Sequence, residues 1–548
     1  MRKKRIVILG GGFGGVFAGK KLEKLIRHER DKYEIILISK SNYFTYQPML
    51  AEIVGGSVGI LDSINSLRSL LPNTSIYVRE ITEINIANQT ITLSPNFSHT
   101  DFVVAYDYLL IALGNVADFQ SSPSGIAEHS IPFKTLKDTI TLRNHLIDVL
   151  ETAASETSKE VRKKLLTFVV VGGGFSGVEI AAEMNDLIRR KVKKNYKSIH
   201  PNEVKIILVH NKKRLVHKEL GKSLGEYCGK ILKKKGVKLL LERKLQSATP
   251  HEAILNDQTK IYTSTIITTS PQKVNPLIET LPLELKEGRV LVDHTLRAVG
   301  HGNIFAVGDC AYVPMQSNMG FAPQTAQFAV QEGKCAAKNI IAHTQKKPLK
   351  TFHRRNWGML AGLGHHHAVA ELAGGFRFSG FFAWLLWRFT YLFKLPGFRR
   401  KVKVMLSWIL EGLAPQDLVQ LNTIVHEGIR HLHYEKGETV FEQGDIGDYL
   451  YVISQGQVEV IVHHDGYDEH IATLGKGEYF GEMAILNQKK RNATIRCLSA
   501  CDFIAILKED FEILTTNFSG LKEEFLKTQE NRKSSSSEEW KREDREAM

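Results

Sequence analysis

The chain has 548 residues, of which 43% are hydrophobic and 24% charged, a composition typical of a globular protein that is too long for a single hydrophobic core. Its five cysteines include no C-x-x-C pair, and the first 227 residues contain none, which indicates a reducing compartment and argues against a disulfide framework. The formal net charge is +14, and much of the excess lies between Lys346 and Leu410, where twelve Lys and Arg stand against one acid, Glu371.

The start of the chain predicts a βαβ unit. Residues 5–9 predict a short buried strand, a helical stretch extends to about residue 29, and residues 33–38 predict the next strand. Between them lies a first glycine loop, Gly10-x-Gly12-x-x-Gly15, which also contains Gly14. This spacing allows a tight turn, lets the backbone approach a pyrophosphate and places a helix N-terminus at the phosphates. A signal peptide is not expected, because the apolar run ends at once in glycines and lacks a cleavage site.

The same pattern returns in the middle of the chain. Residues 167–171 predict a strand, a second glycine loop follows as Gly172-x-Gly174-x-x-Gly177, and residues 204–209 predict the next strand. One such loop is weak evidence, but two loops that each follow an apolar strand are much stronger evidence. We therefore predict an α/β protein with two Rossmann-like dinucleotide-binding domains.

Both units lack the acid that binds the adenosine ribose about 20 residues after many such loops. Ser39, followed by Lys40, stands at the first position, and His210 stands at the second, before Asn211-Lys212-Lys213-Arg214. Loss of the acid beside basic residues can admit the 2′-phosphate of NADPH. A solvated turn with relaxed selectivity explains the same residues, so NADH and NADPH both stay open as donors.

A basic and aromatic segment follows residue 346 and holds four of the five Trp residues. Residues 376–395 are interrupted by Arg377, Arg388 and Lys394, so we do not expect a membrane-spanning helix there. A second amphipathic stretch runs through Trp408, and two such stretches favour helices that lie on an anionic membrane surface. A buried helix pair is the alternative. Nucleic acid is not expected as a partner, because no nucleic-acid motif is present.

The last part of the chain changes composition again. From about residue 430, short apolar runs alternate with glycines, which predicts a small β barrel or jelly roll. The end of the chain, from about residue 530, is charged and contains four serines, which is typical of a disordered tail.

The two glycine loops, together with Phe305-Ala306-Val307-Gly308-Asp309 and Leu109-Leu110-Ile111-Ala112-Leu113-Gly114, resemble the two-dinucleotide flavoprotein family. The resemblance implies a glutathione-reductase-like fold, with Asp309 at the FAD ribitol. It also implies an FAD-binding domain formed by residues 1–115 and 302–345, with an NAD(P)H-binding domain at 116–301 inserted between the two parts.

Three branches of this family compete. Disulfide reductases and sulfide:quinone reductases need cysteines that this chain lacks. The remaining branch is the type II NADH:quinone oxidoreductases, which residues 5–410 resemble. Gln324-Thr325-Ala326-Gln327-Phe328-Ala329-Val330-Gln331 resembles the quinone motif of that branch, and Tyr43–Leu50 resembles its loop after the second strand. Thr268-Thr269-Ser270-Pro271 departs from its Trp-Thr-Ala-Gly-like turn.

The type II resemblance implies specific site residues. Ala326, Gln327 and Gln331 would contact quinone, since residues four apart on a helix share a face; two surface glutamines are the alternative. Glu179 would lie near the nicotinamide and the flavin, or be a helix N-terminal acid. The expected FAD contacts are Gly10, Gly12, Gly14, Gly15, Ser39, Lys40, Gly308 and Asp309. The expected NAD(P)H contacts are Gly172, Gly174, Gly177, Glu179 and His210.

The same resemblance implies a reaction and a location. Hydride would pass from NADH, or NADPH, to FAD, and electrons would pass on to a membrane quinone. No metal is expected. Residues 346–414 would attach the protein peripherally to the cytoplasmic face of the inner or plasma membrane, and a homodimer is expected.

Residues 415–515 resemble a cyclic-nucleotide-binding domain. Phe480-Gly481-Glu482-Met483-Ala484-Ile485-Leu486 and Arg491-Asn492-Ala493-Thr494 resemble the family's phosphate-binding cassette. The resemblance implies that amides near Gly481 and Ala484 meet the cyclic phosphate, Glu482 accepts from the ribose 2′-OH and Arg491 neutralises the phosphate. Asn492 and Ala493 complete the cassette. The ligand is cAMP or cGMP, a non-binding barrel is the alternative, and residues 516–548 are left as a tail.

Two other functions remain open from the residues alone. A soluble reductase would pass electrons to a ferredoxin-like acidic protein. A non-enzymatic protein would sense cyclic nucleotide on a silent flavoprotein scaffold. Regulation of the enzyme by a cyclic nucleotide is a hypothesis, because a shared chain does not establish coupling between two sites.

Overall fold

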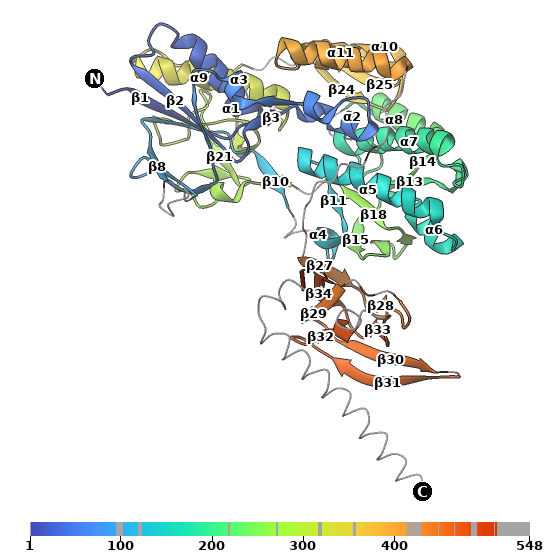
Figure 1. Ribbon diagram of the computed structural model, residues 1–548. Coiled ribbons are helices and arrows are strands. Elements are labelled where there is room, and N and C mark those ends of the chain that lie inside the picture. The colour runs from blue at the N-terminus through green and yellow to red at the C-terminus, as the bar shows by residue number, and fades with distance from the viewer. Residues whose placement is uncertain are drawn as a thin grey trace.

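The structure is a computed structural model. It describes residues 2–94, 102–118, 123–217, 220–269, 272–315, 320–353, 358–413, 419, 429–445, 447, 449–464, 466–483, 490–508 and 510–511. Figure 1 shows two α/β units side by side, a pair of helices above them and a β domain below the second unit.

The first unit is built on a parallel five-stranded sheet in the order β22-β9-β1-β2-β5. Its strands are β1 (Lys4–Leu9), β2 (Tyr33–Ser39), β5 (Ser75–Val78), β9 (Tyr108–Ile111) and β22 (Ile304–Ala306). Leu9 pairs with Ile38 on one side and with Ile111 on the other, so the carboxyl ends of the central strands meet at one edge. The predicted Rossmann-like fold is confirmed, and β22 enters this sheet from a distant part of the chain.

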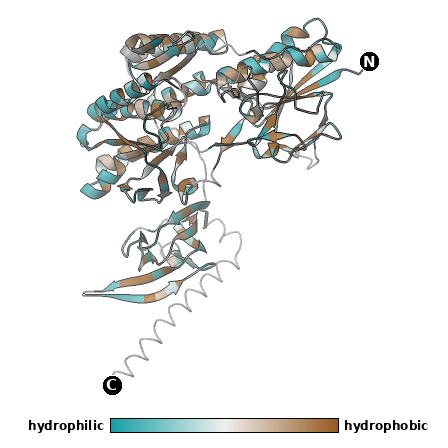
Figure 2. Ribbon diagram, turned by 180° about the vertical axis from the view of Figure 1, so that it is seen from behind, coloured by the Kyte–Doolittle hydropathy of each residue, from teal (hydrophilic) through white to brown (hydrophobic). Residues whose placement is uncertain are grey.

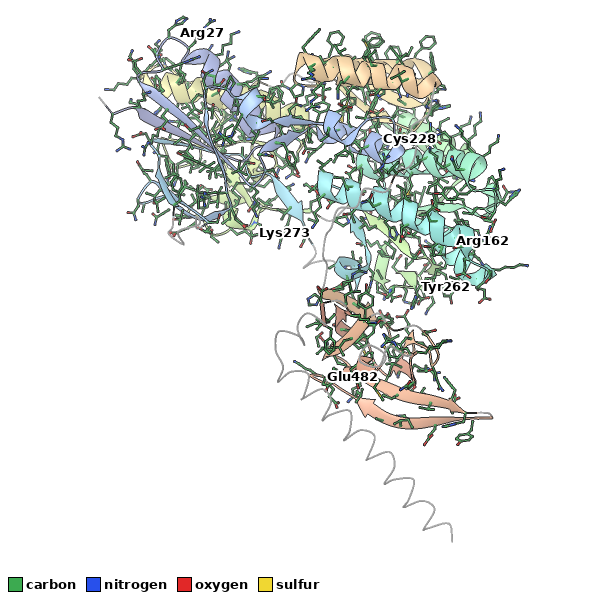
Figure 3. All side chains as sticks on the ribbon, viewed as in Figure 1. Arg27, Arg162, Cys228, Tyr262, Lys273 and Glu482 are labelled. Atoms are coloured by element: carbon green, nitrogen blue, oxygen red, sulfur yellow. The ribbon has the colours of Figure 1, made fainter. Side chains whose placement is uncertain are left out.

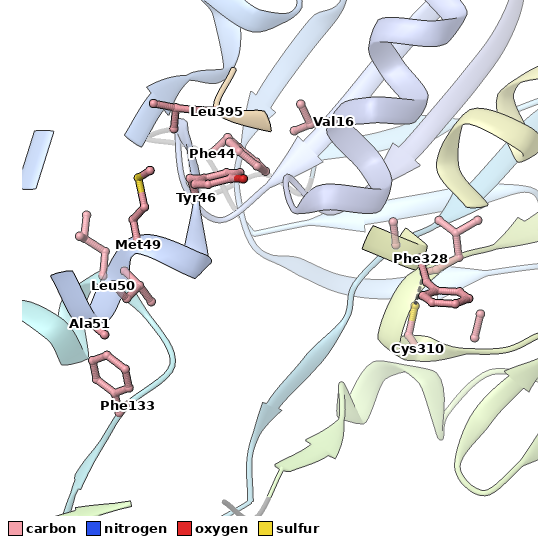
Figure 4. Packing of buried hydrophobic residues seen from close by; sticks show 14 of the residues in the cluster. Val16, Phe44, Tyr46, Met49, Leu50, Ala51, Phe133, Cys310, Phe328 and Leu395 are labelled. Atoms are coloured by element: carbon pink, nitrogen blue, oxygen red, sulfur yellow. Dashed lines mark hydrogen bonds between the residues drawn. The ribbon is translucent and has the colours of Figure 1, made fainter. Parts of the chain in front are cut away.

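Two helices cover the first sheet near that edge. Helix α1 (Phe13–Leu25) starts directly after Gly12, and α9 (Ala326–Thr344) packs against it. The contact is close, because a Cβ added to Gly333 of α9 would overlap the backbone oxygen of Gly14. Residues near the N-terminus and residues 304–344 therefore share one core, part of which is shown in Figure 4.

The second unit repeats the design with the parallel order β11-β18-β12-β13-β14. Its strands are β11 (Ile131–Pro132), β12 (Thr167–Val171), β13 (Lys205–His210), β14 (Val237–Leu241) and β18 (Thr265–Thr268). Its helices are α4 (Ile126–His129), α5 (Leu136–Ser155), α6 (Lys159–Leu165), α7 (Phe175–Asn195) and α8 (Lys222–Lys234). Strands β15 (Leu245–Ala248), β16 (Glu252–Leu255) and β17 (Lys260–Tyr262) form a small antiparallel sheet at its lower edge.

Several smaller elements complete the first unit, and a pair of crossing strands lies between the two units. In the first unit these are β3 (Tyr43–Thr45), α2 (Leu50–Gly55), β4 (Ile64–Ser66), α3 (Leu67–Leu70), β6 (Ile81–Asn85), β7 (Thr90–Leu93) and β8 (Phe102–Ala105). The crossing strands β10 (Asn115–Ala117) and β19 (Gln272–Val274) pair antiparallel. Near the junction, Phe133 of the second unit lies beside Ala51 of α2, as Figure 4 shows.

An antiparallel sheet and two helices follow residue 357. The sheet contains β24 (Gly358–Gly362), β25 (Ala368–Leu372) and β26 (Arg377–Gly380), and α10 (Phe381–Lys394) and α11 (Phe398–Leu413) lie over it. Residues 376–395 were interpreted as helical. For Arg377–Gly380 this is wrong, because these residues form the third strand of the sheet. Gly380, with φ +80°, then makes the turn into α10.

The C-terminal unit is a pair of antiparallel four-stranded sheets, in the orders β27-β34-β29-β32 and β28-β33-β30-β31. The strands are β27 (Ile429–Tyr434), β28 (Thr439–Phe441), β29 (Tyr449–Gln455), β30 (Val458–His464), β31 (Tyr467–Leu474), β32 (Tyr479–Phe480), β33 (Thr494–Cys497) and β34 (Cys501–Leu507). The predicted β domain is confirmed. Its core contains Tyr434, Tyr451, Phe480 and Phe503. The expected tail, 516–548, lies outside the described residues.

Candidate functional site

One cavity of about 510 Å³ lies where the two α/β units meet. It opens at the carboxyl edge of the first sheet, the edge at which ligands bind in open α/β folds. The first unit contributes Gly10–Gly14, Ser39, Ser41, five residues between Tyr43 and Ala51, Ala112–Asn115 and Val307–Asp309. The second unit contributes Phe133–Leu136, Ser176, Glu179 and Gln272.

The first glycine loop forms one wall of the cavity. Gly10 has φ +110°, and a Cβ there would overlap the carbonyl oxygen of Ala112, so only glycine fits. A Cβ at Gly12 would meet no atom within 4 Å, so the space beside it is open to a ligand. Because α1 begins next to Gly12, its free N–H groups are placed to hold the pyrophosphate of a dinucleotide. Gly15 packs against the carbonyl of Gly10 instead of lining the cavity.

Asp309 follows β22 at the same edge of the first sheet and also lines the cavity. The backbone N–H of Gly308 donates to Glu332 Oε2 at 2.7 Å, which fixes the turn before Asp309. Burial raises the pKa of the Asp309 carboxyl, while the charges of Lys134 and Arg289 oppose that shift. Lys134 Nζ donates to Gln272 Oε1 at 2.6 Å, and both residues line the cavity. Sequence reasoning missed Lys134 and Glu332.

Ser39 and Lys40 lie at the end of β2. Ser39 lines the cavity, and its Oγ accepts from the backbone N–H of Ser41 at 3.3 Å. Lys40 forms an ion pair with Glu80 at the surface and does not appear among the cavity-lining residues of the described chain. The structure therefore places one of the two residues at the cavity wall.

The second glycine loop lies across the junction. Gly172 has φ +112°, and α7 begins at Phe175, directly after Gly174. A Cβ at Gly177 would overlap the carbonyl oxygen of Gly172, which keeps the helix close to its strand. The first turns of α7 carry Ser176 and Glu179 to the same cavity that the first loop lines. Gly172, Gly174 and Gly177 are not among the described residues that line this cavity, so the second loop reaches it through the first turns of α7.

His210 closes over the second glycine loop. Its Nδ1 accepts from the backbone N–H of Gly173 at 3.1 Å. Burial lowers the pKa of the imidazole, which agrees with a neutral ring that accepts this bond. Nearby, the guanidinium of Arg214 donates to the carbonyls of Leu220, Gly221 and His217.

Glu179 lies between the two units and the sheet under α10. Its Oε1 accepts from the backbone N–H of Gly362 at 3.0 Å. Burial raises the pKa of Glu179 to about 8, although the Gly362 N–H opposes the shift; the charge of Glu52 adds to it. The carboxyl is therefore mostly protonated at pH 7.

The inner face of α10 packs against Glu179 and Tyr46 beside the cavity, and none of its residues is among the described residues that line the cavity. The rings of Tyr391 and Tyr46 meet edge to face at 6.2 Å, and Trp387 lies 4.8 Å from Tyr391. Arg388 Nη2 lies 3.9 Å from Glu52 Oε1, and its guanidinium lies 4.2 Å from the ring of Trp384. These residues were not foreseen as part of the site, because the sequence of α10 is aromatic on every face.

The glutamine motif is on α9. Gln324 Nε2 donates to the carbonyl of Asp309 at 2.9 Å, and Gln324 and Ala326 line the cavity. Gln331 Nε2 donates to the carbonyl of Gln327 at 3.3 Å, as expected for neighbours on one helix face. Both of these glutamines are half-buried beside the cavity, and neither is among its described lining residues.

The outer face of α10 and α11 is an aromatic surface, which we define as Phe381, Phe382, Phe389, Phe393 and Phe398 with Met405, Leu406, Ile409 and Leu410. All nine are exposed, and Phe398 is 83% exposed. Figure 2 shows that apolar colour extends along these two helices. Arg400 and Lys403 pair with Asp62 beneath α11 at 3.6 and 3.8 Å. Among the described residues, no helix combines the length and apolar character needed to cross a bilayer.

The C-terminal unit holds a second candidate site around Arg491. The guanidinium donates to the carbonyls of Gly481 at 2.7 Å and Tyr449 at 2.8 Å and stacks 4.1 Å from the ring of Phe441. Arg491 and Glu482 are both buried in the described structure. Asn492 is exposed and Ala493 is half-buried, whereas Ala484 lies outside the described residues.

Two glycine loops, each between a parallel strand and a helix whose first turns reach one cavity, define a class of protein, the two-domain pyridine-nucleotide reductases. Residues 4–333 match the family model described as pyridine nucleotide-disulphide oxidoreductase, and residues 357–417 match that of the NDH2 C-terminal domain. Residues 431–517 match the cyclic nucleotide-binding domain. The chain belongs to the type II NADH:quinone oxidoreductase family and carries a cyclic nucleotide-binding domain at its C-terminus.

Relatives and solved structures support the family. The chain is 30% identical to type II NADH:quinone oxidoreductase NdhA of Mycobacterium tuberculosis over 74% of this chain and 86% of that protein. It is 29% identical to Ndh of the same organism over 75% of this chain and 89% of that protein. The structure of NDH2 from Plasmodium falciparum in complex with NADH has a TM-score of 0.70, with 22% identity, and covers 76% of this chain and 100% of that one.

Proposed function

We propose that the protein oxidises NADH at its flavin and reduces a membrane quinone. The observation that carries this proposal is the single cavity lined by the first glycine loop, by Asp309 and by Glu179 of the second unit. When bound, FAD accepts a hydride from NADH and supplies two electrons for quinone reduction. The work of the protein is to place both partners against the flavin and to control water and protons there.

The first unit holds FAD. The α1 N-terminus and Gly12 bind the pyrophosphate, with Gly10, Gly14 and Gly15 shaping the loop, and Ser39 lies toward the adenosine ribose. Asp309 binds the ribitol chain, and the turn at Gly308 fixes its position. Lys134 places a positive charge opposite Asp309 and balances that carboxylate within the cavity. Lys40 assists only from the surface, because it pairs with Glu80.

The second unit holds the nicotinamide nucleotide, with the phosphates at Gly172, Gly174 and Gly177 and the nicotinamide end toward Glu179. NADH is the preferred donor. His210 lies on the loop as a neutral ring, and the guanidinium of Arg214 already donates to three carbonyls. Arg214 is therefore not free to bind the 2′-phosphate of NADPH. Catalytic efficiencies for NADH and NADPH, measured side by side, test this preference; comparable values would contradict it.

Glu179 holds a proton near the flavin. Its raised pKa keeps the carboxyl neutral at pH 7, and a neutral carboxyl can donate a proton or a hydrogen bond where quinone reduction needs one. Quinone enters between Ala326 and the inner face of α10, and Gln327 and Gln331 border that path from α9.

The aromatic surface attaches the protein to an anionic membrane from the cytoplasmic side, and the same region serves as a homodimer contact. Exposed rings beside Arg399 and Lys401 suit a headgroup layer in which the rings enter the acyl boundary and the cations face phosphates. A quinone dissolved in the bilayer then lies close to the inner face of α10.

The C-terminal unit binds cAMP or cGMP. Arg491 supplies the positive charge for the cyclic phosphate, and Glu482 accepts a hydrogen bond from the ribose hydroxyl. The cassette is completed by Gly481, Ala484, Asn492 and Ala493. Isothermal titration with each nucleotide tests this assignment, with Arg491→Gln as the variant expected to lose binding.

The purified holoprotein, supplied with a short-chain ubiquinone analogue, tests the main function. Quinone-dependent NADH oxidation by a yellow protein is the expected result. A flavin that NADH reduces but quinone does not reoxidise would contradict quinone as the acceptor and favour a protein acceptor. Absence of flavin reduction would contradict the enzyme altogether and leave a nucleotide sensor.

A further inference from the structure

The C-terminal unit is docked on the second α/β unit through a defined interdomain contact, made by β27 on α4 and on the turn between β15 and β16. His129 Nε2 of α4 lies 2.7 Å from both the backbone nitrogen and the backbone oxygen of His433 in β27. Thr249 Oγ1 donates to Glu438 Oε1 at 2.8 Å. Figure 1 shows this contact as the place where the β domain meets the body of the molecule.

Tyr434 is the centre of the interdomain contact. It is buried, and its ring lies 6.4 Å from the ring of His129 and 6.0 Å from that of His251, both in the second unit. On its other side it packs 5.6 Å from Phe503 in the core of the C-terminal unit. A shift of the C-terminal core therefore moves a ring that the second unit also contacts.

A chain of packed rings leads from Tyr434 to the candidate nucleotide site. Phe503 packs against Phe480 at 5.3 Å, Phe480 against Phe441 at 5.8 Å, and Phe441 against the Arg491 guanidinium at 4.1 Å. Phe480 also directly precedes Gly481 of the cassette. Strand pairing also links the cassette to the interdomain contact, because β32 pairs with β29, β29 with β34 and β34 with β27.

A short segment leads from the interdomain contact to the flavin cavity. Helix α4 ends at His129, and the next residue, Ser130, places its Oγ 3.2 Å from Thr268 Oγ1. Residues 131–132 form β11, which pairs with β18. The residues that follow, Phe133 and Lys134, line the cavity. Four residues thus separate the docked His129 from Lys134, the cation beside Asp309.

Nucleotide binding would change the hydrogen bonds of Arg491. Two of its N–H groups donate to the carbonyls of Tyr449 and Gly481, which tie β29 to the cassette. A cyclic phosphate would compete for those donors, because charge-assisted bonds to an anion are stronger than bonds to neutral carbonyls. Ligand binding therefore acts at one end of the ring chain, and β27 lies at its other end.

We propose that this interdomain contact is the regulatory interface of the enzyme, through which a cyclic nucleotide at Arg491 repositions Phe133 and Lys134 in the flavin cavity. The inference rests on the proposed nucleotide binding and names the surface by which that binding reaches the proposed dehydrogenase. The partner of the α4 surface is thus the C-terminal domain of the same chain. Bound cyclic nucleotide changes the affinity for NADH by some factor. By thermodynamic linkage, NADH bound in the cavity must change the affinity for cyclic nucleotide by the same factor.

The test compares the full-length holoprotein with a double variant, His129→Ala with Thr249→Val, and with a control, His28→Ala, which removes an exposed histidine of the first unit. Titration calorimetry measures binding of cAMP and of cGMP. Steady-state NADH oxidation with a short-chain ubiquinone analogue measures coupling to activity. Hydrogen–deuterium exchange of residues 126–136 measures coupling to structure and needs no turnover. Thr249→Val alone is a milder variant, should the double variant fold poorly.

In the wild type and in His28→Ala, bound nucleotide is expected to change kcat/KM for NADH by about fivefold or more and to change exchange in residues 126–136. The double variant is expected to bind nucleotide and to lose both effects, and Thr249→Val to lose part of them. Nucleotide that binds the wild type without altering turnover or exchange overturns the inference, as do full effects in the double variant. Failure of both nucleotides to bind is a distinct result, which refutes the ligand assignment and removes the basis of the inference.

Discussion

Glu179 Oε1 accepts a hydrogen bond from the backbone amide of Gly362 at 3.0 Å. Glu179 belongs to α7, which starts at the second glycine loop, and Gly362 ends β24, a strand of the sheet that supports α10. One bond therefore joins the wall of the flavin cavity to the segment that carries the aromatic surface. Several predictions about the cavity depend on this carboxyl.

Replacing Glu179 with Gln is expected to lower kcat for quinone reduction about 100-fold, the lower range for loss of a general acid. The amide keeps the size of the side chain and can still accept from Gly362, so FAD content stays unchanged. Flavin absorbance and quinone-dependent NADH oxidation measure the two quantities. Glu226→Gln, at an exposed glutamate of α8, is the control. Unchanged turnover in Glu179→Gln would remove the proposed role.

The activity is expected to depend on pH through Glu179. Burial raises the pKa of this carboxyl to about 8, so its proton is present at pH 7 and is lost as the pH rises through about 8. Turnover with quinone should therefore fall above pH 8 in the wild type, and this fall should vanish in Glu179→Gln. The folded protein also holds this proton where the unfolded chain has lost it, so the contribution to stability declines from about pH 4.5 to about pH 8. A wild-type profile that is flat to pH 9 would contradict the assignment.

Two glycines of the first loop are expected to differ in what they control. Gly10→Ala should destabilise the protein by about 2 kcal/mol, because φ is +110° and the new Cβ overlaps the Ala112 carbonyl. Gly12→Ala should leave the apoprotein stable, because its Cβ enters open space, but should weaken flavin binding at least tenfold. Thermal unfolding of the apoprotein and flavin titration separate the two effects. Equal loss of stability in both variants would show that the space beside Gly12 is not a ligand site.

Binding to membranes is expected to depend on the aromatic surface. Changing Phe382, Phe393 and Phe398 to Ser removes three exposed rings and should weaken binding to vesicles that contain anionic phosphatidylglycerol by at least 100-fold, since burial of one Phe contributes about 1.5–3 kcal/mol. Tyr262→Ser is a matched control, because this exposed ring lies on the second unit, away from α10 and α11, as Figure 3 shows. Vesicle co-sedimentation measures both. Full binding by the triple variant would assign the attachment elsewhere.

Acid is expected to release the C-terminal unit. Burial lowers the pKa of His129 to about 4, with the charges of His433 and His251 acting in the same direction and the His433 backbone bond and Asp502 opposing it. Burial also lowers the pKa of His251 to about 4, and Lys164 adds to that shift. Both imidazoles are neutral when docked, so docking is fully stable above about pH 6.5 and weakens as the pH falls toward 4.

Small-angle scattering between pH 7 and pH 4.5 measures this release as an increase in the radius of gyration. His129→Ala removes one of the two imidazoles in the contact whose pKa burial lowers, and its curve should depend less steeply on pH. A radius that is constant over this range in the wild type would contradict the predicted weakening.

The sequence predicted the parts of the protein that local patterns encode. Both glycine loops and the strands before them follow from short-range rules about turns, phosphates and strand ends, whereas Asp309 was expected from the resemblance to the flavoprotein family. Lys134, Glu332 and Arg388 did not follow, because each reaches the site from a remote segment and none has a periodic or motif signal of its own. Arg377–Gly380 was mistaken for helix, because an aromatic and basic run has no decisive period and only pairing with Ala368–Glu371 makes it a strand. The contact of His129 with His433 joins residues that no sequence rule relates.

The late arrival of β22 has a consequence for biosynthesis. The sheet of the first unit pairs Leu109 of β9 with Ile304 of β22, roughly 200 residues further along the chain. At about 5–20 residues per second, a ribosome needs on the order of 10–40 s to make the residues between them. During that time β9 is an open sheet edge, Asp309 does not yet exist and α1 lacks its partner α9. Flavin capture is therefore largely confined to the period after α9 leaves the exit tunnel, and chains that stall within the second unit are candidates for chaperone binding and proteolysis.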